Sequence, residues 1–471
     1  MPASRPPSVA GSEPLRRPVD RLARDVLRAN WRSGVRRGVR YAYTCPATPR
    51  YRHQWHWDSC FTAIAWTRFD RDRARDELRT VLRSGDPRIA PVGAHAGPGE
   101  REWDGFLPHT VFWDRPAGWR RTPFYATTSA WGSLATASIG PPLLPLAWER
   151  VAAALRSADP AAADAFAAEG VEPLARHLDW LGRARDLAGD GLLTILLPDE
   201  SGIDDSPQYD PPFGPLAHHR PGYWRLVERA RRAGYDARRF AARHDHHVAD
   251  VWTTTAYALS LRAMARLSGD RTWEALAARS ERTLADRCWD DGAGIFRDLA
   301  GPGRRPVAVS TWSGLAPLVL PGVPEELRRR LVEEQLLDPR RFRAAVGIPS
   351  VSIADPAHRP TFDRWRTWRG PSWINVAWLL LPAMAALGYE QPAREIAAGL
   401  VAAVEREGLR EYYDPRDGRG YGARGFGWSA LACDLADAAE GRWPVPVGEG
   451  TAVGAARSAG ASPAAGTVSG A

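Results

Sequence analysis

Two acidic loops contain the side chains best suited to acid and base chemistry. The first is DESGIDDSPQYD (199–210), which holds Asp199, Glu200, Asp204, Asp205 and Asp210. Packing several carboxylates together raises the proton affinity of at least one, as a general acid at neutral pH requires. The second, REYYDPRDGRGYGARGFGWSAL (410–431), places Glu411 before two tyrosines and a glycine-rich stretch. Taken alone, the first loop is also typical of a helix N-cap region, and Glu411 of a surface residue.

Two tryptophan-rich segments contain residues suited to binding a sugar. The first is YRHQWHWDSCF (51–61), with Trp55, Trp57 and Asp58. The second is RWRTWRGPSWINVAW (364–378), with Trp368, Arg369, Gly370 and Trp373. An indole face can cover the apolar side of a sugar ring while a charged group binds its hydroxyls. For any single tryptophan, packing in the core is the competing interpretation.

The elements that must position these segments are predicted to be helices. The clearest is ADVWTTTAYALSLRAMARL (249–267), which ends at Ser268 and Gly269 and is followed by a second helix over 271–289 that Asp270 can cap. We expect further helices at 17–33, 60–84, 141–157, 171–187, 222–233, 323–336, 372–388, 390–406 and 426–440, with one more at 160–168 or 236–246. No convincing run of alternating strands accompanies them, which predicts stacked or ring-closed helical hairpins.

The connections between these helices are unequal in length. Three of them, 86–127, 198–221 and 340–371, are long, aromatic and rich in glycine and proline, and long connections in compact domains are usually functional. If the hairpins close into a ring, these loops are expected at one end, where they form a deep site. The terminal stretches 1–16 and 447–471 are predicted to be disordered, which leaves one domain over 17–446.

The composition argues against nucleic-acid and membrane partners. All 63 basic residues of the 471 are arginine and the net charge is +8, but the arginines are dispersed beside acidic residues, as in RDRARDELR (71–79), which is typical of solvated helix faces. The longest apolar run, 374–388, is too short to cross a bilayer. No apolar leader follows the N-terminus, so a cytoplasmic protein is expected.

Neither a metal nor a cofactor is predicted. The four cysteines lie far apart and form no CxxC pair, which indicates buried thiols rather than a zinc site or a disulfide framework. The HDHH run (244–247) and the group His53, His56 and Asp58 could be drawn as metal ligands, but adjacent histidines point in different directions on a helix. No P-loop and no GxGxxG after a strand support a nucleotide.

In combination, four motifs resemble a known family. WHWDSCF, ESGIDDSP, WRGPSWIN and EYYDPRDG followed by GFGWSA occur in the order and approximate spacing of the clan of inverting α-glycosidases that includes glycoside hydrolase family 63 and the trehalases. The sequence is most similar to the compact bacterial mannosylglycerate and glucosylglycerate hydrolases, over roughly residues 20–440. The resemblance implies an all-α fold, an (α/α)6 barrel of six helical hairpins, in agreement with the hairpins expected from periodicity.

The resemblance also implies roles for individual residues. Asp204 matches the general acid and Glu411 the general base, with the adjacent Asp205 either supporting Asp204 or exposed. The sugar subsite is implied to contain Trp57, Asp58, Arg369, Gly370, Trp373 and Trp428. An inverting pair is about 6.5–9.5 Å apart, which leaves room for a water molecule, whereas a retaining pair is about 5–5.5 Å apart.

One departure from the family pattern concerns the substrate. SIGPP (138–142) has Gly140 where the relatives have a glutamine that contacts substrate, and loss of this amide removes hydrogen bonds to a sugar hydroxyl or to the aglycone. We expect hydrolysis of a small α-glucoside, α-mannoside or glycosylglycerate. Two alternatives stay open: a sugar epimerase or isomerase on the same toroid, which needs two histidines converging on the site, and a sugar-binding protein without turnover.

Overall fold

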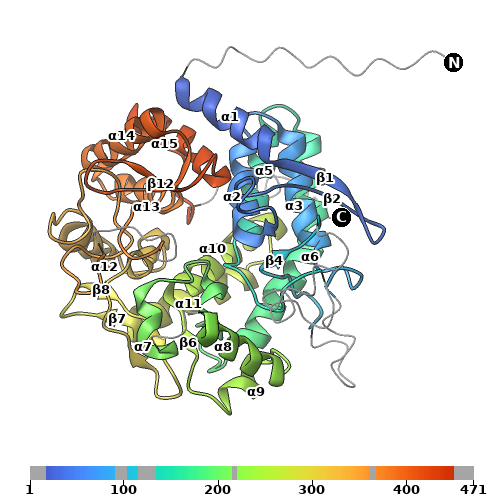
Figure 1. Cartoon of the computed structure of the whole chain (residues 1–471), viewed down its shortest axis with the longest axis vertical. Helices are drawn as coiled ribbons and strands as arrows, with labels where there is room; N and C mark the ends of the chain where they lie inside the picture. The colour runs from blue at the N-terminus through green and yellow to red at the C-terminus, as the bar shows by residue number, and fades with distance from the viewer. Residues whose placement is uncertain (1–16, 91–102, 115–133, 215–219, 360–366, 450–471) are drawn as a thin grey trace, which may run out of the picture.

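The computed structural model describes residues 17–90, 103–114, 134–214, 220–359 and 367–449. The predicted tails, 1–16 and 447–471, lie outside these ranges except for residues 447–449, among which Val447 is buried. In the part of the chain so described, the helices form a closed ring in which the colour runs from blue through green to red (Figure 1). This confirms the predicted all-α fold.

Six helical segments line the inside of the ring. They are α2 (His56–Trp66), α5 (Leu144–Arg156), α10 (Val251–Ser268), η8 (Trp312–Val319), α13 (Ile374–Ala386) and η10 (Gly427–Leu431), which continues into α15 (Ala432–Ala439). Each segment packs on the next in this order, and η10 packs back on α2. The first and last parts of the described chain therefore meet and close the ring, with α1 (Pro18–Asn30) against η10 and α15 (Figure 1).

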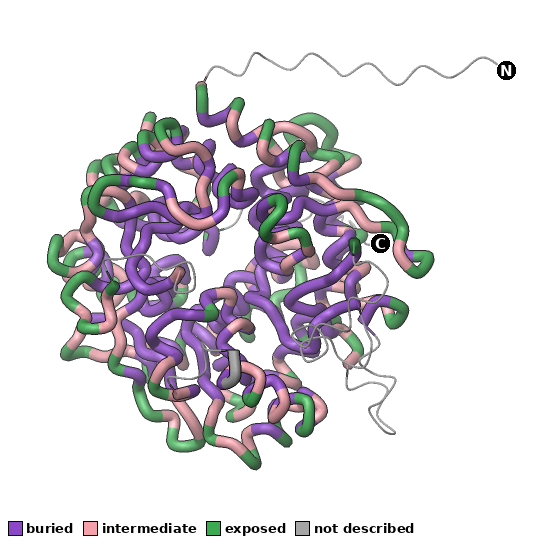
Figure 2. Tube along the Cα trace, in the orientation of Figure 1, coloured by how far each residue is buried: buried purple, intermediate pink, exposed green. Residues whose placement is uncertain are grey.

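Outer helices follow the inner ones along the chain. They are α3 (Arg71–Arg83), α6 (Pro160–Arg185), α11 (Thr272–Thr283), α12 (Glu325–Arg330) and α14 (Glu390–Glu407). The inner α2 is buried along its whole length, whereas the charged α3 buries one side only, as expected for helices inside and outside a ring. Figure 2 shows this division, with buried chain inside and exposed chain around the rim.

Local signals at the ends of α10 agree with the prediction. The Asp250 carboxylate accepts the Thr253 backbone N–H at 2.7 Å, and Gly269 ends the helix with a φ of +74°. A capping carboxylate satisfies an otherwise unpaired N–H group, and glycine adopts the left-handed conformation without steric cost. The predicted helix over 249–267 is therefore confirmed to within two residues.

Other expectations about the elements were wrong. The helix expected over 17–33 ends at Asn30, and the chain then forms a hairpin of β1 (Trp31–Arg36) and β2 (Val39–Thr44), turning at Gly38 with a φ of +75°. The single helix expected over 60–84 is α2 and α3, broken at Asp70, which caps α3. The segments 160–168 and 171–187, expected as separate helices, form one helix, α6, which continues through Gly170 and Pro173.

The absence of strands was also overstated. Besides the hairpin, β10, β9, β6 and β5 form a four-stranded sheet in that order. Its strands are two residues each, too short to produce a visible alternation of polar and apolar residues. These strands are β5 (Thr194–Ile195), β6 (Val248–Ala249), β9 (Leu299–Ala300) and β10 (Arg305–Pro306).

The remaining elements are short, apart from α8. They are β3 (Gln54–Trp55), β4 (Thr110–Val111), η5 (Pro198–Ser201), η6 (Pro207–Tyr209), α7 (Asp210–Phe213), α8 (Arg220–Arg232), α9 (Ala237–Ala241), η7 (Leu284–Cys288), β7 (Trp289–Asp290), β8 (Ile295–Phe296), η9 (Leu331–Leu336), β11 (Arg410–Tyr413) and β12 (Gly420–Arg424). All four cysteines are free and buried, as predicted. Among the described helices, none is long and apolar enough to cross a membrane.

Candidate active site

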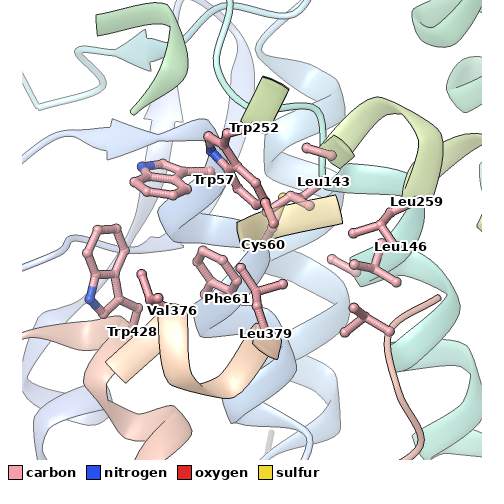
Figure 3. Close-up of a cluster of buried hydrophobic side chains, with 14 of the residues drawn as sticks. Trp57, Cys60, Phe61, Leu143, Leu146, Trp252, Leu259, Val376, Leu379 and Trp428 are labelled. Atoms are coloured by element: carbon pink, nitrogen blue, oxygen red, sulfur yellow. The ribbon is translucent and has the colours of Figure 1, made fainter. Parts of the chain in front are cut away.

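Tryptophans at the start of the inner helical segments meet at one end of the ring. Trp57, Trp252, Trp312 and Trp428 lie in the first turns of α2, α10, η8 and η10, and Trp373 is the N-cap of α13. The ring centroids of Trp57 and Trp428 are 5.0 Å apart, and those of Trp252 and Trp312 are 4.9 Å apart. Figure 3 shows Trp57, Trp252 and Trp428 within one buried cluster. These five indoles therefore form a buried tryptophan cluster at the N-terminal ends of the inner segments.

Several indole N–H groups of the tryptophan cluster donate no hydrogen bond. Trp368 and Trp373 stack face to face, with centroids 3.8 Å apart and an interplanar angle of 5°. Among the described residues, the Nε1 atoms of Trp312, Trp373 and Trp428 are buried and have no hydrogen-bond partner. A buried donor without a partner is unfavourable, and sugar hydroxyls are the kind of acceptor that would satisfy such donors.

Asp58 lies in the first turn of α2, beside Trp57. It is 5% exposed, and burial raises its pKa well above 3.8, with additional contributions from the charges of Glu411 and Glu77. Its own backbone N–H donates the hydrogen bond that opposes this shift. The helix N-terminus also favours a carboxylate, so Asp58 is suited to accepting hydrogen bonds from substrate hydroxyls.

Glu411 is a buried carboxylate held in a fixed orientation. It lies in β11 at a break in the register with β12, and it is 4% exposed. Oε1 accepts the Tyr51 hydroxyl at 2.9 Å, Oε2 accepts the Ala423 N–H at 2.7 Å, and the Arg50 guanidinium lies 3.7 Å from Oε2. Burial raises its pKa above 4.5 while these partners oppose the shift. A buried, oriented carboxylate with raised proton affinity has the properties of a general base.

Gly422 provides the space that Glu411 occupies. Its φ is +70°, and a Cβ at this position would lie 2.5 Å from both Cβ and Oε2 of Glu411. We expect Gly422→Ala to displace the carboxylate and lower kcat/KM by about tenfold or more, alongside a loss of about 1 kcal/mol of stability from the left-handed backbone. Gly269→Ala is the matched control, since Gly269 has a φ of +74° in the left-handed region with nothing within 4 Å of its Cβ. Equal activity of the two variants would contradict this role for Gly422.

Asp204 follows a turn that packs against the tryptophan cluster. Gly202 has a φ of +72°, a Cβ there would meet the Trp57 ring at 2.6 Å, and Trp252 donates from Nε1 to the Ser201 carbonyl at 3.1 Å. Asp204 itself is exposed. Its charge contributes to raising the pKa values of Tyr51 and Glu411. The predicted acid and the predicted base therefore lie close enough to interact electrostatically.

Asp205 is buried rather than exposed. Its Oδ1 accepts the Trp368 N–H at 2.8 Å and the Thr367 hydroxyl at 3.4 Å. Burial and the charge of Asp204 raise its pKa well above 3.8. Asp205 therefore joins the acidic loop to the tryptophan-rich segment, and Asp204 is the one that faces solvent.

A buried ion pair fixes the acidic loop from the other side. Glu200 accepts from both terminal nitrogens of Arg185, at 2.7 and 2.8 Å, and also from the backbone N–H groups of Leu196 and Ile139. Both charged side chains are 1% exposed. Breaking such a pair leaves an uncompensated buried charge, so Glu200 serves to anchor the loop to α6.

Arg369 and Gly370 are held by protein groups. Both terminal nitrogens of Arg369 donate to Asp210, at 2.7 and 2.8 Å, while its Nε is buried without a partner. Gly370 has a φ of +145°, and a Cβ there would meet the Arg359 carbonyl oxygen at 2.8 Å. Direct sugar contacts by these two residues stay predictions, whereas their contacts to the loops around the site are explicit.

Gly140 borders a group of buried histidines. A Cβ on Gly140 would lie 3.1 Å from Nδ1 of His109 and from Cβ of His56. Burial lowers the pKa of His109 to about 4 and that of His56 well below 6.5. Both rings are therefore neutral at neutral pH. Among the described residues, no group of three or more histidine, cysteine, aspartate or glutamate side chains could hold a metal ion.

The four motifs are thus brought together by direct contacts. Tyr51, just before the first motif, contacts Glu411 in the fourth, and Asp205 joins the second to the third. Ser372 pairs its backbone with that of Tyr413 and so joins the third to the fourth. Tyr51 was not singled out from the sequence. It is 360 residues from Glu411 along the chain, and no local spacing signals such a contact.

Comparisons with known proteins match most of this chain. The model of the mannosylglycerate hydrolase MGH1-like glycoside hydrolase domain matches residues 51–429. The mannosylglycerate hydrolase of Thermus thermophilus is 32% identical over 84% of this chain and 97% of its own length. The glucosylglycerate hydrolase of Mycolicibacterium hassiacum is 26% identical over 83% of this chain and 92% of its own length.

A solved structure gives the same result for the fold. The mannosylglycerate hydrolase of glycoside hydrolase family 63 from Thermus thermophilus, in complex with Tris and D-glycerate, superposes with a TM-score of 0.73 at 30% identity, over 88% of this chain and 98% of that one. The likeness therefore extends over most of the ring of helices. The chain belongs to the mannosylglycerate hydrolase MGH1-like family of glycoside hydrolases.

Proposed function

We propose that this glycosidase hydrolyses the α-glycosidic bond of mannosylglycerate or glucosylglycerate with inversion. Asp204 is the general acid and Glu411 the general base. The observation that carries the proposal is the environment of Glu411, a buried carboxylate oriented by Tyr51 and the Ala423 N–H next to the charge of Asp204. The substrates of the two curated relatives support the choice of aglycone.

Two proton transfers accompany the proposed reaction. Asp204 gives its proton to the glycosidic oxygen, and the bond from that oxygen to the anomeric carbon breaks. Glu411 takes a proton from a water molecule, whose oxygen attacks the anomeric carbon from the opposite face. Asp58 and the tryptophan cluster hold the sugar in the orientation that this displacement requires.

Tyr51→Phe should change the pH dependence in a defined direction. The Tyr51 hydroxyl stabilises the ionised form of Glu411, so its removal raises the pKa of the base. Because the base must be ionised, we expect the acidic limb of the kcat/KM profile to move to higher pH by about half a unit to one unit. Tyr43→Phe is the control, because Tyr43 donates to the Arg52 carbonyl oxygen rather than to Glu411. An unmoved acidic limb in Tyr51→Phe would contradict the assignment.

The substrate is tested with a panel of pure α-glycosides. Mannosylglycerate, glucosylglycerate, glucosylglycerol, trehalose and kojibiose are incubated with the protein, and free sugar and free glycerate are quantified. The proposal predicts release of glycerate from at least one of the first two, with the highest kcat/KM of the panel. A higher kcat/KM for an uncharged glycoside would overturn the proposal that the aglycone is glycerate. Binding without release from any compound would favour the sugar-binding alternative.

The predicted cytoplasmic location and the absence of a nucleic-acid partner stay predictions. A small saccharide is the partner that the site supports, through the unpaired indole N–H groups and Asp58. An epimerase or isomerase would leave every glycosidic bond in the panel intact, so the same experiment distinguishes that alternative.

A further inference from the structure

Asp204 lies in a tight turn over residues 203–206 of the acidic loop. The Ser206 N–H donates to the Ile203 carbonyl oxygen at 2.9 Å, so Asp204 and Asp205 are the two central residues of this turn. Asp205 is buried and bonded to the Trp368 N–H, whereas Asp204 is exposed. The position of the Asp204 carboxyl group therefore depends on what holds the ends of the turn.

Gln208 holds the second end of this turn. The Ser206 hydroxyl donates to Gln208 Oε1 at 3.0 Å, and the Thr311 hydroxyl donates to the same oxygen. Gln208 Nε2 donates to Asp298 Oδ2 at 2.7 Å. All four residues are at most 5% exposed. The Gln208 amide therefore uses both its oxygen and its nitrogen to join the turn to two other segments of the chain.

Both of these segments lead into the tryptophan cluster. Thr311 is the N-cap residue of η8, directly before the tryptophan of that segment. Asp298 Oδ1 accepts the Val251 N–H at 2.8 Å, directly before the tryptophan of α10. A buried polar network in which every member is bonded makes the surrounding structure rigid. Gln208 therefore fixes the turn that carries Asp204 relative to the tryptophan cluster.

We propose that Gln208 is a positioning residue for the general acid, and that it acts through Ser206 rather than on the substrate. This inference rests on the proposed function, in which Asp204 is the acid. Proton transfer requires the acid to lie within hydrogen-bond reach of the glycosidic oxygen. A displacement of about 1 Å, caused by a mutation away from the chemistry, can lower the rate by about 10²-fold.

The leaving group distinguishes this role from a purely structural one. Glycerate needs a proton from Asp204 as it departs, whereas fluoride needs much less help from an acid. A misplaced acid therefore slows hydrolysis of a glycosylglycerate and spares an α-glycosyl fluoride, whereas a damaged fold slows both. The ratio of the two kcat/KM values is thus the quantity to measure.

Gln208→Leu should lower kcat/KM for mannosylglycerate or glucosylglycerate by about 10- to 100-fold, and kcat/KM for the fluoride by about threefold at most. Gln335→Leu is the matched control, because Gln335 is a buried glutamine in η9 whose Nε2 donates to the Ala293 and Gly294 carbonyl oxygens. This control should leave the ratio unchanged. An equal loss on both substrates in Gln208→Leu, or the same change of ratio in Gln335→Leu, would overturn the inference.

Ser206→Ala is a smaller change at the same connection. It removes only the hydroxyl that joins the turn to Gln208, so it tests the inference even if Gln208→Leu fails to fold. We expect a loss of about 3- to 10-fold on the glycosylglycerate alone. In the double variant the two losses should not add, because both substitutions break the same connection. Fully additive losses, or an unchanged ratio in Ser206→Ala, would contradict a route through Ser206.

Asp204→Asn separates a failure of this inference from a failure of the proposed function. If Asp204→Asn spares hydrolysis of the fluoride and Gln208→Leu does not, Asp204 is the acid and only the role of Gln208 is wrong. Full activity of Asp204→Asn on the glycosylglycerate would instead overturn the assignment of the acid in the proposed function.

Discussion

Asp204→Asn is expected to lower kcat/KM for a glycosylglycerate by about 10²- to 10⁴-fold, the usual contribution of a general acid. Glycerate is a poor leaving group unless its oxygen is protonated, and an amide cannot give that proton. Asp204 is exposed and the loop is held by Glu200 and Asp205, so the unfolding temperature should change little. Steady-state kinetics and thermal denaturation check the two expectations.

A glycosyl fluoride separates the acid from other roles. Fluoride leaves with much less help from a proton, so the Asp204→Asn variant should retain most of its activity on the α-glycosyl fluoride while it fails on the glycerate. If both substrates are lost equally, Asp204 binds or orients the sugar instead. If both are kept, another group is the acid.

Glu411→Gln is expected to abolish hydrolysis of both substrates, a loss of about 10²- to 10⁴-fold or more, because activation of water is needed whatever the leaving group. Glu407→Gln is the control on the preceding helix, since Glu407 contacts Arg406 and the Gly420 N–H at the surface. Hydrolysis of the fluoride by Glu411→Gln at the wild-type rate would contradict the role of base.

The same variant should alter stability in a predictable direction. The pKa of Glu411 is raised in the folded protein, so the folded state binds more protons than the unfolded state above pH 4.5, and stability falls as pH rises through that window. Glutamine cannot ionise, so Glu411→Gln should remove this loss. We expect its unfolding temperature at neutral pH to equal or exceed that of the wild type, as measured by calorimetry at several pH values.

The motifs in the sequence, rather than the helical period, singled out the candidate site residues. Four of the predicted residues lie at the start of inner helical segments, in or beside the tryptophan cluster: Trp57, Asp58, Trp373 and Trp428. Helical periodicity predicted most of the inner and outer helices, because both kinds carry apolar residues at helical spacing. It missed the inner segment η8 and the break between α2 and α3. The resemblance carried by the motifs, together with the helical period, therefore predicted the architecture, whereas the roles of these residues at the sugar stay predictions.

Contacts between segments far apart in the chain could not be predicted from the sequence. The Tyr51 hydroxyl and the Gly422 backbone define the position of Glu411 only in three dimensions. Arg369 was expected at the sugar, yet Asp210 binds both of its terminal nitrogens. The β1–β2 hairpin was missed because RSGVRRGVR has few apolar positions and its register depends on the left-handed Gly38.

The central claim is that Glu411 directs water to the face of the sugar opposite the bond that Asp204 protonates. The most direct measurement is proton NMR of the sugar anomer released during the first turnovers, before mutarotation. From mannosylglycerate or glucosylglycerate, the account predicts that the β-anomer appears first. Initial release of the α-anomer would contradict it, because that outcome requires a carboxylate to attack the sugar directly.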